Sequence, residues 1–589
     1  MGGRRNRAVA ASLALAVAAA ATAAEAPATA PPAAEQAAAR RIAAPALRAH
    51  VKFLAHDLLE GRFPGTRGGR LAEAYVAAQL EAAGLEPGAP DGGWFQEVPL
   101  VAVTSRPTGP MRFSAAGRAL ALADGDDMVA SPWTIGPRSD WSDAEVVFVG
   151  YGIAAPEFAW DDFKGVDLRG KVLLVMNDDP DWDPALFAGK ARLYYGRWTY
   201  KYEEAARRGA AGAIVIHTTP SAAYPWQVVR TSNGGTRLQL RPGGAPTLAI
   251  RAWATEEGSR RIASLGGHDL DALRASARRR DFRPVPLGVR VSLSLENDVA
   301  EVRAANVVGR LPGRHPALGG EAVLYTAHHD HLGVKRGAEP GPGTVFHGAV
   351  DNATGVAALI EIARAAAGLA ERPPRTLYFA AVTGEEQNLL GSQWLASHPP
   401  VPVTRLAAVI NMDAMNVLGR TRDLVLVGQG KSTLDADVAA LAAWQGRSVK
   451  GEAHPEFGAY YRSDHFSFAK VGVPGAYVGA GDQFVGRPEG WAEAQRQAFV
   501  QQHYHQPSDV WRDGYDLSGM IEDARLLFHL GVRLAGADGL AAWRPGDEFE
   551  AVRRRALDAA PREAGPGGGP GGAAPTSPAR VEPAPPAAR

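Results

Sequence analysis

Four short polar clusters in the middle of the chain carry side chains that are suited to metal chemistry. They are His328-His329-Asp330-His331, Asp351-Asn352, Glu385-Glu386 and Asn411-Met412-Asp413. Imidazole nitrogens and carboxylate oxygens are donors that Zn²⁺ accepts, with Co²⁺ or Mn²⁺ as substitutes. Because the chain has no cysteine, histidines and carboxylates must hold any metal. The clusters therefore predict a hydrolytic metal site.

The acidic residues of these clusters suit different roles. Asp351 lies at a glycine-rich turn into a helix-like run, where a short carboxylate can bridge two ions. Glu385 directly precedes the predicted ligand Glu386, so it can take a proton from an attacking water and return it to a leaving amine. If one strand continues through His328 and Asp330, both side chains point the same way. The Asp330 carboxylate then hydrogen-bonds the far nitrogen of the His328 ring and orients it.

Each cluster also has a simpler explanation when it is taken alone. Glu385-Glu386 could be a solvated loop, and Asp351-Asn352 could be a helix N-cap. Their joint occurrence after strand-like runs favours a common site instead. We interpret His329, His331 and His347 as ordinary polar residues and leave them out of the ligand set.

The elements around the clusters predict the fold. Short apolar runs typical of buried strands alternate with helix-like runs. The strands are predicted at 323–326, 376–382, 406–410 and 424–427, and the helices at 353–368, 389–397, 433–444 and 519–535. Such an alternation brings the polar clusters to one edge of a sheet. The predicted fold class is therefore α/β, with a sheet between helices and the active site at its edge.

These motifs resemble the M28 family of zinc aminopeptidases. The residues that carry the resemblance are Ala327–Asp330, Gly348–Gly355, Glu385-Glu386 with Leu389, Gly391 and Ser392, Asn411–Asp413, Tyr461–His465 with Phe468 and Gly472–Pro474, and Tyr504-His505. The resemblance covers about residues 306–536. It implies a phosphorylase/hydrolase-like mixed sheet flanked by helices and two zinc ions per chain. It also adds His505 to the predicted metal ligands, a residue that its spacing from the other clusters does not identify.

The resemblance implies a specific division of labour. Its five metal ligands are His328, Asp351, Glu386, Asp413 and His505. Of these, His328 and Asp413 bind one ion, Glu386 and His505 bind the other, and Asp351 bridges them. Five ligands with one bridge fit the count that a two-metal site requires. The resemblance also implies Glu385 as the general base. From its spacing to His328, Asp330 is predicted as the second catalytic residue.

Length and composition predict several segments. The chain has 589 residues, too many for one ordinary core. We expect a signal peptide at 1–24, a flexible leader at 25–40, the first part of the peptidase domain at 41–130, an inserted smaller α/β domain at 131–290, the main peptidase domain at 291–548 and a disordered Pro/Gly/Ala-rich tail at 549–589. The insertion resembles a protease-associated (PA) domain. Within the first part, the turn-rich segment 60–68 is interpreted as a surface connection before a helix at 71–83.

The N-terminal residues predict export. Arg4, Arg5 and Arg7 form a basic region before the apolar run 8–20, and small residues follow at 21–23, as in a secretory signal peptide. We therefore expect a periplasmic or secreted protein without stable membrane insertion. Lys and Arg together number 63, as do Asp and Glu, so nothing suggests a nucleic-acid partner.

The predicted function is hydrolysis of N-terminal residues from peptide substrates. A carboxypeptidase or another amidohydrolase on the same scaffold is the alternative within enzymes, and basic residues that grip a C-terminal carboxylate would distinguish it. Arg462 is one candidate for such a residue. A non-catalytic binding protein and a single-zinc glutaminyl cyclase are further alternatives, but both predict a reduced ligand set. The oligomeric state does not follow from the sequence.

Overall fold

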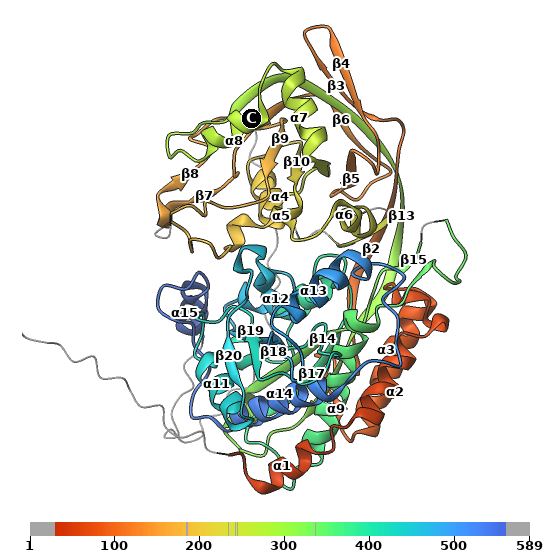
Figure 1. Ribbon diagram of the computed structural model, residues 1–589, viewed down its shortest axis with the longest axis vertical. Coiled ribbons are helices and arrows are strands. Elements are labelled where there is room, and N and C mark those ends of the chain that lie inside the picture. The colour runs from red at the N-terminus through yellow and green to blue at the C-terminus, as the bar shows by residue number, and fades with distance from the viewer. Residues whose placement is uncertain are drawn as a thin grey trace, which may run out of the picture.

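Two lobes share one long β-ribbon. The computed structural model describes residues 30–560, except 184, 185, 234, 242, 244 and 336. Strands β2 (Phe95–Pro107) and β13 (Val285–Leu311) pair antiparallel and run from the lower lobe into the upper lobe (Figure 1). The predicted signal peptide and most of the predicted tail lie outside the described residues. The ribbon therefore joins the inserted segment to the lobe that carries the polar clusters.

The lower lobe contains the predicted mixed sheet. Next to the end of β13, its strands in spatial order are β17 (Thr376–Val382), β14 (Ala322–His328), β18 (Leu406–Asn411), β21 (Gly475–Ala480), β19 (Asp423–Leu426) and β20 (Ser448–Lys450). Strands β17, β14, β18 and β21 are mutually parallel. Strand β13 runs antiparallel to β17, and β19 runs antiparallel to β21 and parallel to β20. Every residue of β14, β17 and β18 is buried, as expected for parallel strands that are covered on both faces.

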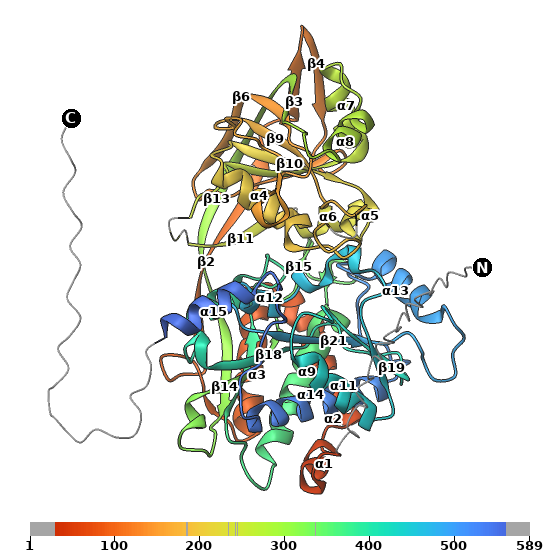
Figure 2. The same cartoon turned by 90° about the vertical axis from the view of Figure 1, so that its left-hand side faces the viewer.

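Helices cover both faces of this sheet (Figures 1 and 2). One face packs against α9 (Thr354–Ala367) and α14 (Ser518–Gly536), with α2 (Ala44–Leu54) and α3 (Arg67–Ala82) beside α9. The other face packs against α10 (Leu390–Ser397) and α12 (His465–Ala469). The α/β fold class predicted from the sequence is confirmed.

The upper lobe has its own core, although its strands are joined to those of the lower lobe through β13. Its central strands β6 (Arg138–Phe148), β9 (Val172–Met176), β10 (Gly212–His217) and β12 (Ile250–Thr255) are parallel. Helices α4 (Trp198–Arg207) and α7 (Glu256–Leu265) pack on these strands. The core also includes Met111, Phe113 and Leu122, which precede residue 131. The likeness of this lobe to a PA domain stays a prediction.

Both predicted flexible ends contain helices. Within the predicted leader, α1 (Ala33–Ala39) buries Ala38 and Ala39 against the main core, because an alanine-rich run is both helix-forming and able to pack closely. The predicted tail begins with α15 (Glu550–Ala559). Its Arg553 is buried and donates hydrogen bonds to the carbonyls of Val403 and Leu406. The predictions of flexibility from 25 and of disorder from 549 are therefore wrong for these helices.

The segment 60–68 is more than a surface connection. It belongs partly to the 3₁₀ turn η1 (Asp57–Arg62), and α3 begins at Arg67, before the predicted start at 71. Arg62 is 1% exposed and donates hydrogen bonds to the carbonyls of His329, His347 and Gly348 at 2.9, 2.6 and 3.0 Å. Gly61 has φ +69°, and a Cβ there would lie 2.3 Å from the Gly333 carbonyl oxygen. The glycine thus lets Arg62 reach beneath two of the polar clusters.

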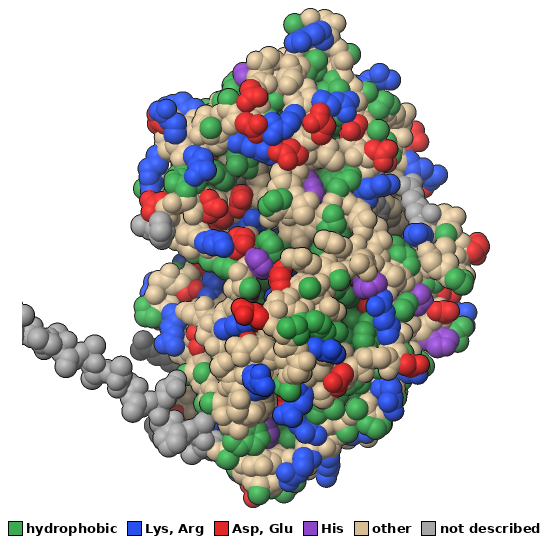
Figure 3. Space-filling view, in the orientation of Figure 1, with side chains coloured by type: hydrophobic (Ala, Val, Ile, Leu, Met, Phe, Trp, Pro, Cys, Tyr) green, Lys and Arg blue, Asp and Glu red, His purple; other side chains and the backbone are tan. Residues whose placement is uncertain are grey.

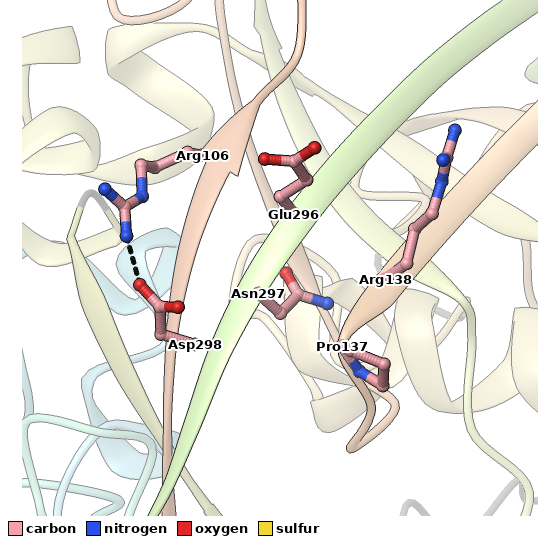
Figure 4. A pocket seen from close by; sticks show the side chains of 6 residues that line it. All are labelled: Arg106, Pro137, Arg138, Glu296, Asn297 and Asp298. Carbon is pink, nitrogen blue, oxygen red and sulfur yellow. Dashed lines mark hydrogen bonds and ion pairs between the residues drawn. The ribbon is translucent and has the colours of Figure 1, made fainter.

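The described surface has mixed charges and a hollow away from the clusters. Among the described residues, no helix is long and apolar enough to cross a membrane. Acidic and basic side chains are interspersed on the face in Figure 3. A hollow on the connecting ribbon is lined by Arg106, Arg138 and Asp298 among others (Figure 4). Both of its arginines are already paired, Arg106 with Asp298 and Arg138 with Asp140.

Candidate metal centre

The predicted clusters meet at one edge of the lower sheet. His328 is the last residue of β14, Glu385 and Glu386 follow β17, and Asp413 follows β18. These strands are parallel, so their carboxyl ends lie side by side. Asp351 lies in the turn that leads into α9. The sheet thus supplies three of the clusters and the start of a helix supplies the fourth.

One group of donor atoms surrounds His328. Its Nε2 lies 3.3 Å from Oδ1 of Asp351 and 3.4 Å from Oδ1 of Asp413. These three residues each offer a donor atom within 4.8 Å of the others. His328 and Asp413 are the two predicted ligands of one ion, and Asp351 is the predicted bridging carboxylate.

A second group lies on the other side of Asp351. The Oδ2 of Asp351 is 3.3 Å from Nε2 of His505, and this nitrogen is 3.1 Å from Oε2 of Glu386. The two carboxylate oxygens of Asp351 therefore face different histidines. All five predicted ligands come together, and the position of Asp351 between the two groups suits a bridge.

His331 belongs to the second group, although it is not among the ligands predicted from the sequence. Its Nδ1 lies 2.5 Å from Oε1 of Glu386, and His331, Asp351 and Glu386 have donor atoms within 4.8 Å of one another. The ring is 0% exposed and lies edge-on to His505 with ring centroids 5.9 Å apart. The only signal in the sequence was its place in the cluster His328-His329-Asp330-His331, three residues after His328, and this did not distinguish it from His329.

The donor set fits a metal such as zinc. His328 Nε2 and Glu386 Oε1 are buried and make no hydrogen bond of normal geometry. Buried polar atoms rarely lack a partner, and buried histidines and carboxylates without partners are typical of metal ligands. The nitrogen and oxygen chemistry of the set also suits a borderline cation.

Neighbouring groups hold the predicted ligands in place. The Ser463 hydroxyl donates to Oδ2 of Asp413 at 2.6 Å. The carboxylate of Asp509 accepts a hydrogen bond from the backbone N–H of Asp351 at 3.1 Å. Asn352 is fully buried, and its side chain donates to the Met412 carbonyl, which ties the Asp351 turn to the end of β18. These contacts fix the orientation of the carboxylates before any ion binds.

The predicted hydrogen bond from the His328 ring to the Asp330 carboxylate is not formed. Strand β14 ends at His328, so the alternation of a strand does not extend to Asp330. The His328 Nδ1 is 3.2 Å from the Asp330 backbone carbonyl and 3.8 Å from its carboxylate. The carboxylate instead accepts the N–H of Glu385 at 3.1 Å. Asp330 thus orients His328 through its backbone and Glu385 through its side chain.

The electrostatics of the site call for additional positive charge. Burial raises the pKa of Glu385 well above its usual value; the positive charge of His328 opposes this shift, and the negative charges of Asp413 and Glu386 add to it. Burial likewise raises the pKa of Asp330 to about 7, against the charge of His328. Carboxylates crowded at this density repel one another, and a bound cation relieves that repulsion.

The upper lobe also contacts the site. On α6 (Trp226–Asn233), the Ser232 hydroxyl lies 2.6 Å from Nδ1 of His505. The backbone N–H of Leu238 donates to the side chain of Gln387, next to Glu386. Nothing in the sequence around Ser232 marks it as functional, because its role depends on a packing between lobes that local patterns do not encode.

The part of the chain that matches a known protein family contains all of these clusters. Residues 306–528 match the family model "Peptidase family M28". A stretch of 66 residues, 11% of this chain, is 48% identical to a "Probable zinc metalloprotease" of Pyrenophora tritici-repentis (strain Pt-1C-BFP). A relative from Pyrenophora teres f. teres (strain 0-1) has the same name and the same identity over 66 residues. The match spans only 14–15% of the length of these curated relatives.

Two solved structures are similar to this chain at low sequence identity. An aminopeptidase from Aneurinibacillus sp. strain AM-1 is 18% identical, with 86% of this chain and 97% of that chain covered and a TM-score of 0.47. A zinc aminopeptidase from Bacillus subtilis is 17% identical, with 83% and 93% covered and a TM-score of 0.41.

Proposed function

We propose that this chain, in which residues 306–528 belong to peptidase family M28, hydrolyses the N-terminal residues of peptides at a centre of two zinc ions. The observation that carries the proposal is the position of Asp351. Its two carboxylate oxygens each lie 3.3 Å from a different histidine, His328 and His505. A carboxylate between two donor groups is what a two-metal site requires.

Five side chains would hold the ions. His328 and Asp413 serve one position, Glu386 and His505 serve the other, and Asp351 serves both. Zinc at these positions supplies Lewis acidity, which polarises the peptide carbonyl and makes a water acidic enough to react near neutral pH. His331 supports the second position through its contact with Glu386.

Glu385 acts as the general base. Its carboxylate takes a proton from the attacking water as the oxygen–carbon bond forms, and it gives that proton to the amine as the carbon–nitrogen bond breaks. The Asp330 carboxylate accepts the Glu385 N–H at 3.1 Å and so keeps the base in position. The side chain of Glu385 lies 3.9 Å from Nε2 of His328, beside the first donor group.

A panel of substrates tests the reaction. Aminoacyl and dipeptide substrates with a free amino terminus are compared with their N-acetylated counterparts, for the intact chain and for Glu385→Ala. We expect turnover only with a free amino terminus and loss of turnover in the variant with the metal retained. Equal cleavage of N-acetylated substrates would favour a carboxypeptidase or another amidohydrolase. Absence of both metal and turnover would favour a binding protein.

We also propose that the protein is exported. The basic residues Arg4, Arg5 and Arg7 ahead of the apolar run 8–20 support this, and periplasmic or secreted peptides would then be its substrates. Cell fractionation with N-terminal sequencing of the mature protein tests it. A start near residue 24 or 25 is expected, and an uncleaved cytosolic chain would contradict it.

A further inference from the structure

A buried arginine of the upper lobe faces the lower lobe without a partner. Arg197 precedes α4 and is 4% exposed. Its Nε and Nη1 atoms are buried and make no hydrogen bond, and its side chain forms no ion pair within the described part of the chain. A buried guanidinium carries five donors, so leaving it unpaired is costly.

The neighbouring buried cations are different, because they have partners. Arg192 donates to the carboxylate of Asp178 at 3.0 Å and to the Ser221 carbonyl at 2.6 Å. Lys201 donates to the carbonyls of Asp178 and Tyr195 at 2.8 and 2.6 Å. Groups of the upper lobe therefore accept hydrogen bonds from these two cations, whereas Nε and Nη1 of Arg197 have no acceptor.

A second arginine approaches from the lower lobe. Arg462 follows the 3₁₀ turn η8 (Ala459–Tyr461), and its guanidinium lies 5.0 Å from the ring centroid of Tyr224 in the upper lobe. Burial lowers the pKa of Arg462 and the neighbouring Tyr504 raises it, with a net rise. The ring of Tyr504 lies 3.9 Å from that of the predicted ligand His505. Arg462 thus lies between the upper lobe and the metal centre.

The two arginines are close enough to influence each other. Burial lowers the pKa of Arg197 to about 9, and the positive charge of Arg462 adds to this effect. A Cβ on Gly458, four residues before Arg462, would lie 3.4 Å from Cδ of Arg197. The largest influences on the pKa of Arg197 are burial, two arginines and two tyrosines, with no acidic residue among them. Two like charges held together in a buried place are stabilised when an anion binds between them.

We propose that Arg197 and Arg462 form a subsite that binds a carboxylate of the peptide substrate, beside Glu385 and His505. The inference rests on the proposed peptidase function and narrows its substrate class. Guanidinium groups match the planar carboxylate and can bind it in a bidentate manner. The carboxylate has two possible sources, the acidic side chain of an N-terminal Asp or Glu residue and the free C-terminus of a dipeptide.

Two pairs of substrates distinguish these sources. Glutamyl p-nitroanilide is compared with glutaminyl p-nitroanilide, and the dipeptide Leu-Gly is compared with its C-terminal amide. We expect the wild-type chain to prefer the carboxylate-bearing member of one pair by at least about tenfold in kcat/KM, mainly through KM. Arg197→Met and Arg462→Met should each reduce this preference at least about tenfold, and Arg197→Lys should retain part of it.

Arg251→Met is the matched control. Arg251 is also in the upper lobe and its guanidinium lies over Trp133 with 5.0 Å to the ring centroid, so its removal should leave the preference unchanged. The midpoint of thermal unfolding shows whether each variant is folded, and its zinc content shows whether the metal is bound. A preference that is absent in the wild-type chain, or that both methionine variants retain, would overturn the subsite.

A binding measurement separates this inference from the proposed function. Calorimetric titration of glutamate is compared with that of leucinamide, which has no carboxylate, on the wild-type chain and on Arg197→Met. Glutamate binding that the variant loses supports the subsite even if no peptide is hydrolysed, in which case only the peptidase function fails. Equal glutamate affinity in both chains contradicts the subsite whatever the activity.

Discussion

The Ser232 hydroxyl of the upper lobe lies 2.6 Å from Nδ1 of His505 in the lower lobe, although 273 residues separate the two in sequence. The other ring nitrogen of His505 faces Asp351 and Glu386 at 3.3 and 3.1 Å. A partner on one ring nitrogen fixes the tautomer and the direction of the other. The upper lobe therefore contacts the candidate metal centre directly.

Ser232→Ala should weaken the second metal position. The loss of an outer partner of a ligating histidine typically costs about 10- to 100-fold in metal affinity or activity. Competition with a zinc chelator measures the affinity, and Ser232→Thr should restore it. Thr231→Ala is the control, because the Thr231 hydroxyl bonds only to the carbonyls of Gln227 and Val228. A Ser232→Ala chain with wild-type zinc affinity would contradict this role.

His331→Ala should also affect the second position selectively. His331 lies 2.5 Å from Glu386, so its removal leaves that carboxylate without a neighbour on one oxygen. We expect one tightly bound zinc per chain after dialysis against a chelator, in place of two. His347→Ala is the matched control, since the His347 ring contacts Asp57 and the Pro507 carbonyl instead. Retention of two zinc ions by the His331 variant would remove this residue from the site.

Arg62→Ala should destabilise the whole chain. The variant would leave the carbonyls of His329, His347 and Gly348 without their donor in a buried place. Loss of such a buried, charged donor costs on the order of 3 kcal/mol or more in the free energy of unfolding. Denaturation of the zinc-loaded chain measures this cost, and Arg70→Ala on the exposed side of α3 is the comparison. Equal stability of both variants would contradict the structural role of Arg62.

Glu73 makes stability depend on pH. Burial raises the pKa of Glu73 from 4.5 to about 7, although the Ala305 N–H and the charge of Arg70 lower it. The folded chain therefore binds this proton more tightly than the unfolded chain does. The stability that the proton contributes is complete below about pH 4.5 and is lost as the pH rises to about 7.

Glu73→Gln removes this dependence, because glutamine stays neutral. The variant should match the wild type near pH 5 and exceed it at pH 8 by up to about 3 kcal/mol in the free energy of unfolding. Chemical denaturation at the two pH values measures the difference. Glu81→Gln, at an exposed position on the same helix, should change stability little at either pH. A gain for Glu73→Gln that is equal at both pH values would contradict the argument.

The sequence predicted the lower sheet well, because its strands are short apolar runs that end directly in the polar clusters. For example, β14 ends at His328, the first residue of a polar cluster. Helix α9 likewise begins at Thr354, directly after the cluster that contains Asp351. The role of Asp330 was harder to predict, since it depends on where the strand stops. Arg62 and Ser232 were missed because each acts through a contact with a distant segment. The ribbon of β2 and β13 was missed for the same reason, since only the paired strands show its length.

The roles of Asp351 and Glu385 are tested most directly by measuring zinc content and turnover together in Asp351→Asn and Glu385→Gln. Asp351→Asn should lose both bound zinc and turnover, because the amide cannot replace a carboxylate that serves two positions. Glu385→Gln should keep two zinc ions per chain and lose turnover by at least about a hundredfold, as expected for a general base. A Glu385→Gln chain that retains turnover, or an Asp351→Asn chain that retains two zinc ions, would contradict the proposed centre.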